Sequence, residues 1–191
     1  YGPDKMNGPS QQEPIVNRMI QLDPQDASNY FALAKIREDA GDYEKAEEVL
    51  LQSKQARPND PQVYLQLAGF YNRQEEFEKT IEALNQRAAI EPNNPEAFYT
   101  ISTYYWDKAY RDFRLKEPEK KEFVMKGIEQ VDKALQLKPD YMEALTYKNL
   151  LLRLQANLEK DQAKQSALLK EADKLRDQAL DLQKKQAAGI K

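Results

Sequence analysis

Two consecutive stretches of 34 residues decide the fold: residues 27–60 read ASNYFALAKIREDAGDYEKAEEVLLQSKQARPND, and residues 61–94 read PQVYLQLAGFYNRQEEFEKTIEALNQRAAIEPNN. The stretches share a register, because an aromatic, a large aliphatic and a small residue recur at the same places. These places are Tyr30, Leu33 and Ala34, then Tyr64, Leu67 and Ala68, and then Phe98, Ile101 and Ser102. Self-similarity at a fixed period of about 20–50 residues is typical of repeat proteins, in which each unit is buried by its neighbours.

Each unit is predicted to fold as two helices joined by a tight turn. Tyr30, Leu33 and Ala34 lie at i, i+3 and i+4, which places them on one helical face. Gly41 then interrupts the helix and lets the chain reverse. Pro58 ends the returning helix, because proline cannot donate the hydrogen bond that extension requires. The sequence therefore predicts an all-α protein built from helical hairpins.

This pattern resembles the tetratricopeptide repeat, a family of 34-residue helix–turn–helix units. The motif residues are Gly41, Tyr43, Ala46 and Pro58 in the first complete unit, and Leu67, Ala68, Tyr71, Phe77 and Pro92 in the second. A third unit ends in GIEQVDKALQLKPDY, residues 127–141. The resemblance covers residues 15–158 and implies a right-handed α-solenoid of helix–turn–helix repeats.

The resemblance divides the chain into six segments. They are an extended N-terminal arm (1–12), a capping half-repeat (13–26), the first repeat (27–60), the second repeat (61–94), a third repeat with an elongated hairpin (95–141), and an atypical terminal repeat with a capping helix (142–191). The terminal segment departs from the motif, since Lys148 stands where leucine is expected.

The third unit is longer than the others. Pro92 and Pro139 are 47 residues apart, which is 13 more than the repeat length. The additional residues are mostly helix formers, so we predict elongated helical hairpins rather than a loop. The long helices are expected over about 95–115, about 118–137, 141–158 and 162–185, the last with an apolar seam at Leu168, Ala172, Leu175, Ala179 and Leu182. The two hairpins should pack side by side and cap the solenoid.

The resemblance also implies where a partner binds, because the first helices of such repeats line a concave surface that holds peptides. The residues on or near this surface are Phe31, Lys35, Leu65, Gly69, Asn72, Tyr99, Thr103 and Trp106. A second interpretation stays open for Tyr99 and Trp106, which share a helical stripe with Tyr110 and Phe113. In that interpretation the stripe packs under residues 142–187, and for Tyr110 and Phe113 we favour this packing role.

The expected function is a non-enzymatic scaffold that binds a peptide or protein. Some family members clamp a partner's C-terminal carboxylate, but the clamp positions here hold Phe31, Lys35, Gln66, Glu96 and Thr100, so no clamp is expected. The alternative is a structural subunit of a cell-envelope or extracellular assembly, held through residues 1–12 and the solenoid ends. In that case the arm docks on a neighbouring copy, whereas otherwise it folds back on its own first helices.

Composition excludes several other classes. The 191 residues include no Cys and no His, which excludes disulfides and thiolate or imidazole metal sites. We find no nucleotide-binding or nucleophile motif, and expect no catalytic residue and no cofactor. The net charge of −3 argues against nucleic acid, and no apolar run approaches the roughly 20 residues that span a bilayer. The lack of Cys and the start at Tyr1, which a cleaved signal peptide is one way to explain, slightly favour an exported (periplasmic or extracellular) protein over a cytoplasmic one. We expect a bacterial protein.

Overall fold

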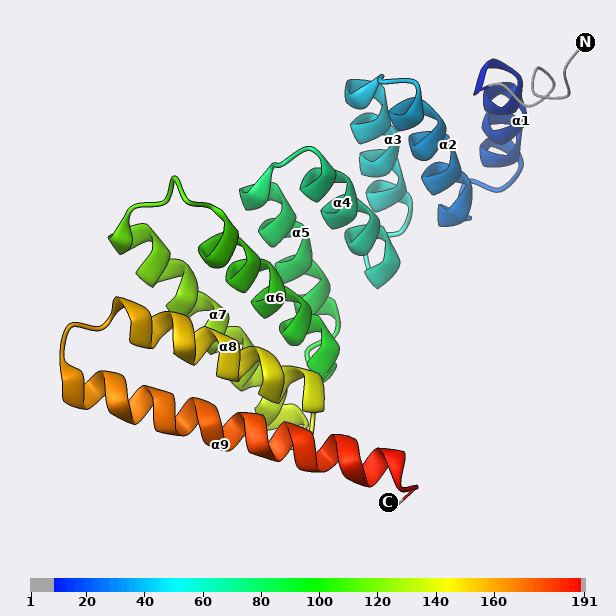
Figure 1. Cartoon of the computed structure of the whole chain (residues 1–191). Helices are drawn as coiled ribbons and strands as arrows, with labels where there is room; N and C mark the ends of the chain where they lie inside the picture. Colours follow the sequence, from blue (N-terminus) through cyan, green and yellow to red (C-terminus); the bar gives the residue numbers. More distant parts are fainter. Residues whose placement is uncertain (1–8, 190–191) are drawn as a thin grey trace, which may run out of the picture. The chain divides into compact units, whose positions relative to one another are not determined.

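The structure is a computed structural model that describes residues 9–189 (Figure 1). Within these residues all regular structure is helical, so the expected all-α helical-repeat fold is confirmed. The helices are α1 (Pro9–Leu22), α2 (Ala27–Asp39), α3 (Tyr43–Ala56), α4 (Pro61–Arg73), α5 (Phe77–Ile90), α6 (Pro95–Arg111), α7 (Glu117–Leu137), α8 (Met142–Leu158) and α9 (Gln162–Ala187). They form two compact units, residues 1–90 and residues 91–191.

The repeat register has a local physical cause at the start of each first helix. Asp26 and Asp60 cap α2 and α4 by accepting hydrogen bonds from the backbone N–H two residues on, each at 3.0 Å. The tyrosines act in the same register, because the hydroxyls of Tyr30 and Tyr64 donate to the proline carbonyl six residues earlier, at 3.0 and 2.6 Å. Pro and Tyr therefore recur every 34 residues because the same hydroxyl-to-carbonyl hydrogen bond forms in each repeat.

The turns inside the two repeats of unit 1, between α2 and α3 and between α4 and α5, share one backbone geometry. Gly41 has φ of 78°, and Glu75 takes the same place in the second repeat with φ of 59°. In each turn the next residue donates its backbone N–H to a carbonyl five residues back, Asp42 to Arg37 and Glu76 to Tyr71, both at 2.9 Å. This helix ending favours glycine, because a side chain in the left-handed region is strained.

Replacing Glu75 with glycine is therefore expected to stabilise the protein. The left-handed conformation costs a non-glycine residue on the order of 1 kcal/mol, so Glu75→Gly should raise the free energy of unfolding by about that amount. Urea unfolding followed by far-UV circular dichroism measures the change. Gly41→Ala is the reciprocal control and should lose a similar amount. A fall in stability for Glu75→Gly would contradict the strain argument.

Unit 2 contains the elongated hairpins that the 13 extra residues predicted. α6 has 17 residues and α7 has 21, against 13 and 14 in α4 and α5. α6 ends at Arg111, four residues earlier than expected, because Asp112 leaves the helix and organises the turn that follows. The terminal pair agrees with its expected bounds to within two residues.

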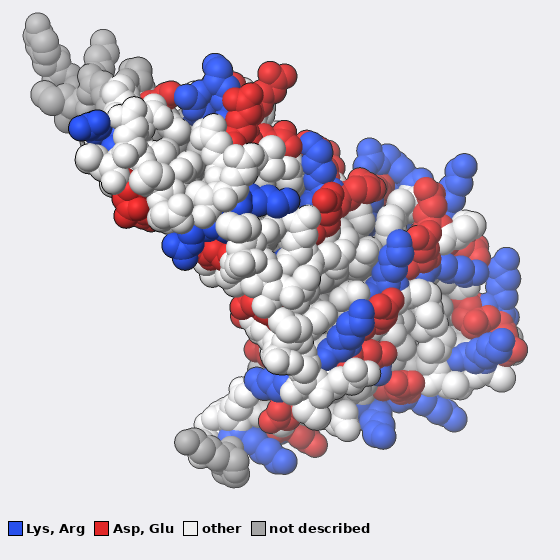
Figure 2. Space-filling view, turned by 180° about the vertical axis from the view of Figure 1, so that it is seen from behind, with Lys and Arg blue, Asp and Glu red and all other residues white. Residues whose placement is uncertain are grey.

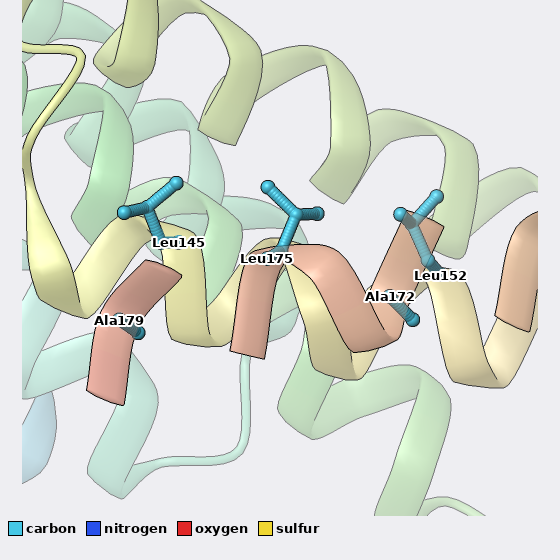
Figure 3. Close-up of a cluster of buried hydrophobic side chains, with 5 residues drawn as sticks. All are labelled: Leu145, Leu152, Ala172, Leu175 and Ala179. Atoms are coloured by element: carbon cyan, nitrogen blue, oxygen red, sulfur yellow. The ribbon is translucent and has the colours of Figure 1, made fainter. Parts of the chain in front are cut away.

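The core of unit 2 follows the seam that the sequence predicted on α9. In Figure 3, Leu145 and Leu152 of α8 lie beside Ala172, Leu175 and Ala179 of α9, and all five are buried. Leu168 and Leu182, the other two residues of the predicted seam, pack against this cluster. α8 and α9 are therefore held together along an apolar seam.

Lys148, which stands where the repeat motif has leucine, forms ion pairs with two neighbouring helices. Its ammonium group lies 2.9 Å from a carboxylate oxygen of Asp132 in α7 and 3.6 Å from one of Glu171 in α9. The side chain is mostly buried, so one cation from α8 pairs with both neighbouring helices. This bridge replaces the apolar contact that the motif's leucine would make.

The N-terminal segments differ from their expected bounds. Residues 9–12, which we expected in the arm, belong to α1, so the capping helix begins before residue 13. Residues 1–8, on which the docking of the arm depends, lie outside the described residues. Among the helices of the described part, none has the length and apolarity needed to cross a membrane.

Candidate functional site

In unit 1 the expected binding residues lie on the first helices of the two repeats. Phe31 and Lys35 are on α2, and Leu65, Gly69 and Asn72 are on α4. Phe31, Leu65 and Gly69 are half-buried, whereas Lys35 and Asn72 are exposed. All five therefore keep some contact with solvent, as binding residues require.

The two first helices of unit 1 are joined by an ion pair close to these residues. The Arg73 guanidinium in α4 donates two hydrogen bonds to the Glu38 carboxylate in α2, at 2.6 and 2.9 Å. Arg73 follows Asn72 directly, and Glu38 lies three residues after Lys35. A bidentate pair fixes the geometry of both partners, so it holds this surface in place.

In unit 2 the expected binding residues lie on α6, and two of them pack against α8. Trp106 meets Tyr147 edge to face at 5.6 Å between ring centroids, and Tyr99 meets the same ring at 5.4 Å. Both also pack on the buried cluster around Val131 and Leu151. The structure thus gives Tyr99 and Trp106 a packing role. Thr103, the third residue, is half-buried beside them.

The outer part of the aromatic stripe does not pack as expected. Tyr110 stacks on Trp106 at 4.9 Å, yet 60% of it is exposed, and Phe113 is 90% exposed. The interpretation that both pack under residues 142–187 is therefore wrong. For Phe113 the reason is the early end of α6, since this residue lies in the turn rather than on the helical face, whereas Tyr110 is still on α6.

Asp112 organises the turn that displays Phe113. Its carboxylate accepts hydrogen bonds from the backbone N–H of Arg114 at 3.1 Å, from the Arg114 guanidinium at 2.9 Å, and from Lys108 at 2.9 Å. The hydrogen bonds from Arg114 and Lys108 hold the pKa of Asp112 well below its usual range. The turn is therefore fixed by a carboxylate that stays ionised at neutral pH.

A groove of about 360 Å³ lies among α6, α8 and α9 in unit 2. It is lined by Tyr99, Met142, Glu143, Thr146, Tyr147, Asn149, Arg176, Ala179, Leu180 and Gln183. Of the residues that the sequence placed at a binding surface, Tyr99 is in this lining. The α9 residues were not expected, because helical periodicity identifies the buried seam of α9 but not what lies along its edge.

The groove combines apolar walls with neutral and charged polar groups. Burial raises the pKa of the Tyr99 hydroxyl to about 12, and the nearby Tyr147 and Tyr141 add to this shift. The hydroxyl therefore stays protonated at neutral pH and can donate a hydrogen bond. Arg176 pairs with Asp173 and Asp177, at 3.0 and 2.9 Å. Such a lining suits a peptide side chain held by apolar contact and a few hydrogen bonds.

The acidic side chains of the described residues do not form a metal-binding cluster. Within residues 9–189 no group of three or more Asp and Glu side chains is placed to hold a metal ion. On the face shown in Figure 2, Lys and Arg side chains are interspersed with Asp and Glu. This mixture agrees with the small net charge of the whole chain.

The repeat signal is also found by comparison with known families. Residues 13–65 match the model of the tetratricopeptide repeat. Over these residues the chain is similar to the tetratricopeptide repeat, and the rest of the chain lies outside the match. Comparison with curated protein sequences gives no significant match.

Solved structures extend the likeness to most of the chain. A crystal structure of MamA is 20% identical, with a TM-score of 0.63 over 92% of this chain and 89% of that one. MamA from Desulfovibrio magneticus RS-1, residues 41 to the end, is 17% identical, with a TM-score of 0.59 over 95% and 89%. YrrB, described as a tetratricopeptide repeat protein with an unusual peptide-binding site, is 13% identical, with a TM-score of 0.56 over 95% and 86%. At these identities the likeness concerns the fold.

Proposed function

We propose that this protein is a non-enzymatic scaffold whose unit 2 groove binds a segment of a partner peptide or protein. The observation that supports it is the groove itself, in which aromatic rings of α6 and α8 meet polar and apolar side chains of α9. Tetratricopeptide repeats, which residues 13–65 resemble, are in general protein-binding units. YrrB, one of the structurally similar proteins, is described as having a peptide-binding site.

The groove suits an apolar side chain flanked by hydrogen-bonding backbone. Tyr99 and Tyr147 are held rigid by their ring contacts, so little ordering is needed when a ligand binds. Glu143 and Thr146 are exposed at the groove and can bond to backbone groups of an extended segment. Thr103 in unit 2 is a further proposed contact, whereas the ring contacts of Trp106 give it a packing role. Independently of the groove, Phe31, Lys35, Leu65, Gly69 and Asn72 remain the proposed partner contacts of unit 1.

A matched pair of surface leucines tests this proposal. Leu180 lines the groove and is 44% exposed, whereas Leu137 at the end of α7 is 42% exposed and is not in the lining. Leu180→Glu places a charge in the groove and should weaken partner binding at least about tenfold, since burying one leucine contributes roughly 1.5–3 kcal/mol. Leu137→Glu should leave binding unchanged.

The partner for this measurement is found by photocrosslinking. A crosslinking amino acid at the exposed groove position Thr146 captures the binding segment in native extract, and the purified partner is then titrated against both variants. Equal affinity for the Leu180→Glu and Leu137→Glu proteins would show that the groove is not the binding site.

A further inference from the structure

The unit 2 groove contains a carboxylate whose charge no neighbouring side chain balances. Glu143 lies in the first turn of α8, is exposed, and lines the groove. It forms no ion pair within residues 9–189. Its charge acts on the aromatic wall of the groove, because it contributes to the raised pKa of the Tyr99 hydroxyl. Glu143 is therefore available to pair with a group that a ligand supplies.

The other charged residue of the lining, Arg176, is already neutralised. Its guanidinium lies 3.0 Å from a carboxylate oxygen of Asp173 and 2.9 Å from one of Asp177, both on α9. Asp173 also pairs with Arg153 of α8, so the charges of this network balance. The lysines at 184–185 of α9 are exposed and do not line the groove. The charge that the lining presents to a ligand is therefore negative and comes from the α8 carboxylate.

Tyrosine rings lie in the same groove and can hold a cation. Tyr99 and Tyr147 both line it and meet edge to face, with 5.4 Å between ring centroids. The chain already places a cation in this way next to the groove. Tyr141 packs on Tyr99 at 5.1 Å, and the ammonium group of Lys138 lies 4.8 Å from the centroid of the Tyr141 ring. A cation of a ligand would gain from the ring faces as well as from the carboxylate.

The rest of the groove supplies apolar contact and a hydrogen-bond donor. α8 and α9 run in opposite directions, so the first turn of α8 lies beside the last turns of α9 (Figure 1). Met142 and Leu180 consequently line the groove together with Glu143. Asn149, which is 7% exposed, accepts a hydrogen bond from Nε of Arg153 at 2.9 Å through its Oδ1. Its Nδ2 remains as a donor, which suits a backbone carbonyl of an extended segment.

We propose that the groove selects a basic segment, in which a Lys or Arg side chain pairs with Glu143 beside the tyrosine rings and a neighbouring aliphatic side chain packs on Leu180. This inference rests on the proposed function, because it names the chemistry of the partner that the groove binds. An exposed ion pair contributes less than the burial of an aliphatic side chain. Apolar contact therefore supplies most of the affinity, whereas the charge of Glu143 decides which segments bind.

The probe is a peptide selected from a phage-displayed library of random linear sequences on the immobilised full chain. Groove ligands are the recovered peptides whose binding is weakened by Leu180→Glu and unchanged by Leu137→Glu. Compared with the unselected library, these peptides should be enriched in Lys and Arg next to aliphatic residues.

A charge swap on one such peptide tests the role of Glu143. Fluorescence anisotropy should show that Glu143→Lys weakens binding at least about fivefold, because an attraction becomes a repulsion. The peptide with its basic residue replaced by Glu should bind Glu143→Lys more tightly than it binds the unchanged protein. Glu44→Lys is the matched control, because Glu44 is exposed in the first turn of α3 as Glu143 is in the first turn of α8. Circular dichroism should be the same for both variants, since both replace exposed side chains.

The outcomes separate this inference from the proposed function. If Leu180→Glu weakens no recovered peptide, the groove is not the binding site, and both proposals fail. If Leu180→Glu weakens binding but the groove ligands lack basic residues, or Glu143→Lys binds them as Glu44→Lys does, the groove binds peptides without selecting basic ones. The proposed function then stands and this inference is overturned.

Discussion

Gly127→Val is expected to lower the free energy of unfolding by about 3 kcal/mol, because three helices of unit 2 meet at this glycine. A β-carbon at position 127 would lie 2.8 Å from a terminal carbon of Leu151 in α8 and 3.2 Å from the β-carbon of Tyr105 in α6. Both neighbours are buried, and the Tyr105 atom is fixed to the backbone. Real β-carbons do not approach other atoms as closely as 2.8 Å, so the helices must separate.

Alanine substitutions at two helical glycines separate packing from helix propensity. Alanine is a better helix former than glycine by about 1 kcal/mol, which favours both Gly127→Ala and Gly69→Ala. At Gly69 the nearest atom to a new β-carbon is Nη1 of Arg73, at 3.3 Å. A shift of a few tenths of an ångström at the end of this long side chain relieves the contact, so Gly69→Ala should stabilise. At Gly127 the steric crowding should cancel or exceed the free energy gained from helix propensity, so Gly127→Ala should leave stability unchanged or lower it.

Urea unfolding followed by circular dichroism measures both alanine proteins and the valine protein. Trp106, the single tryptophan, adds a fluorescence signal from unit 2 for the variants at Gly127. Equal stabilisation by Gly127→Ala and Gly69→Ala would show that α7 has room for a side chain at this point, contrary to the packing described.

Much of the fold could be predicted from the sequence, because it depends on local signals. The 34-residue register is set by caps and turns that each involve a few neighbouring residues, as at Asp60 and Gly41. The long helices of unit 2 and the seam on α9 follow from periodicity alone. Local rules of this kind do not depend on how helices from distant parts of the chain meet.

The candidate site was less predictable, because it depends on the positions at which neighbouring helices pack against one another. Tyr99 could be identified from its place in the repeat, but Arg176 and Leu180 enter the groove through the lateral fit of α9 on α8. The turn at Asp112 was missed for another reason. A carboxylate that accepts from both Lys108 and Arg114 ends α6 before its apolar pattern ends, so Phe113 leaves the face that periodicity assigned to it.

Trp106→Ala should lower the free energy of unfolding by about 3 kcal/mol, which would assign this residue to the core rather than to a surface anchor. The indole meets Tyr147 edge to face and stacks on Tyr110, and it packs on the buried cluster between α7 and α8. Truncation removes all three contacts and leaves a cavity that the rigid neighbours cannot fill. Urea unfolding followed by circular dichroism gives the value, since the variant has no tryptophan.

Phe113→Ala is the control for Trp106→Ala and should change stability by less than about 0.5 kcal/mol, because the phenylalanine ring is almost fully exposed. The comparison also bears on binding, since a core residue cannot be removed without disturbing the groove beside it. If the Trp106→Ala protein is as stable as the Phe113→Ala protein, Trp106 contributes little to packing. Its position on α6 then makes it a partner anchor, as the repeat resemblance implied, and the binding surface extends from Tyr99 along α6.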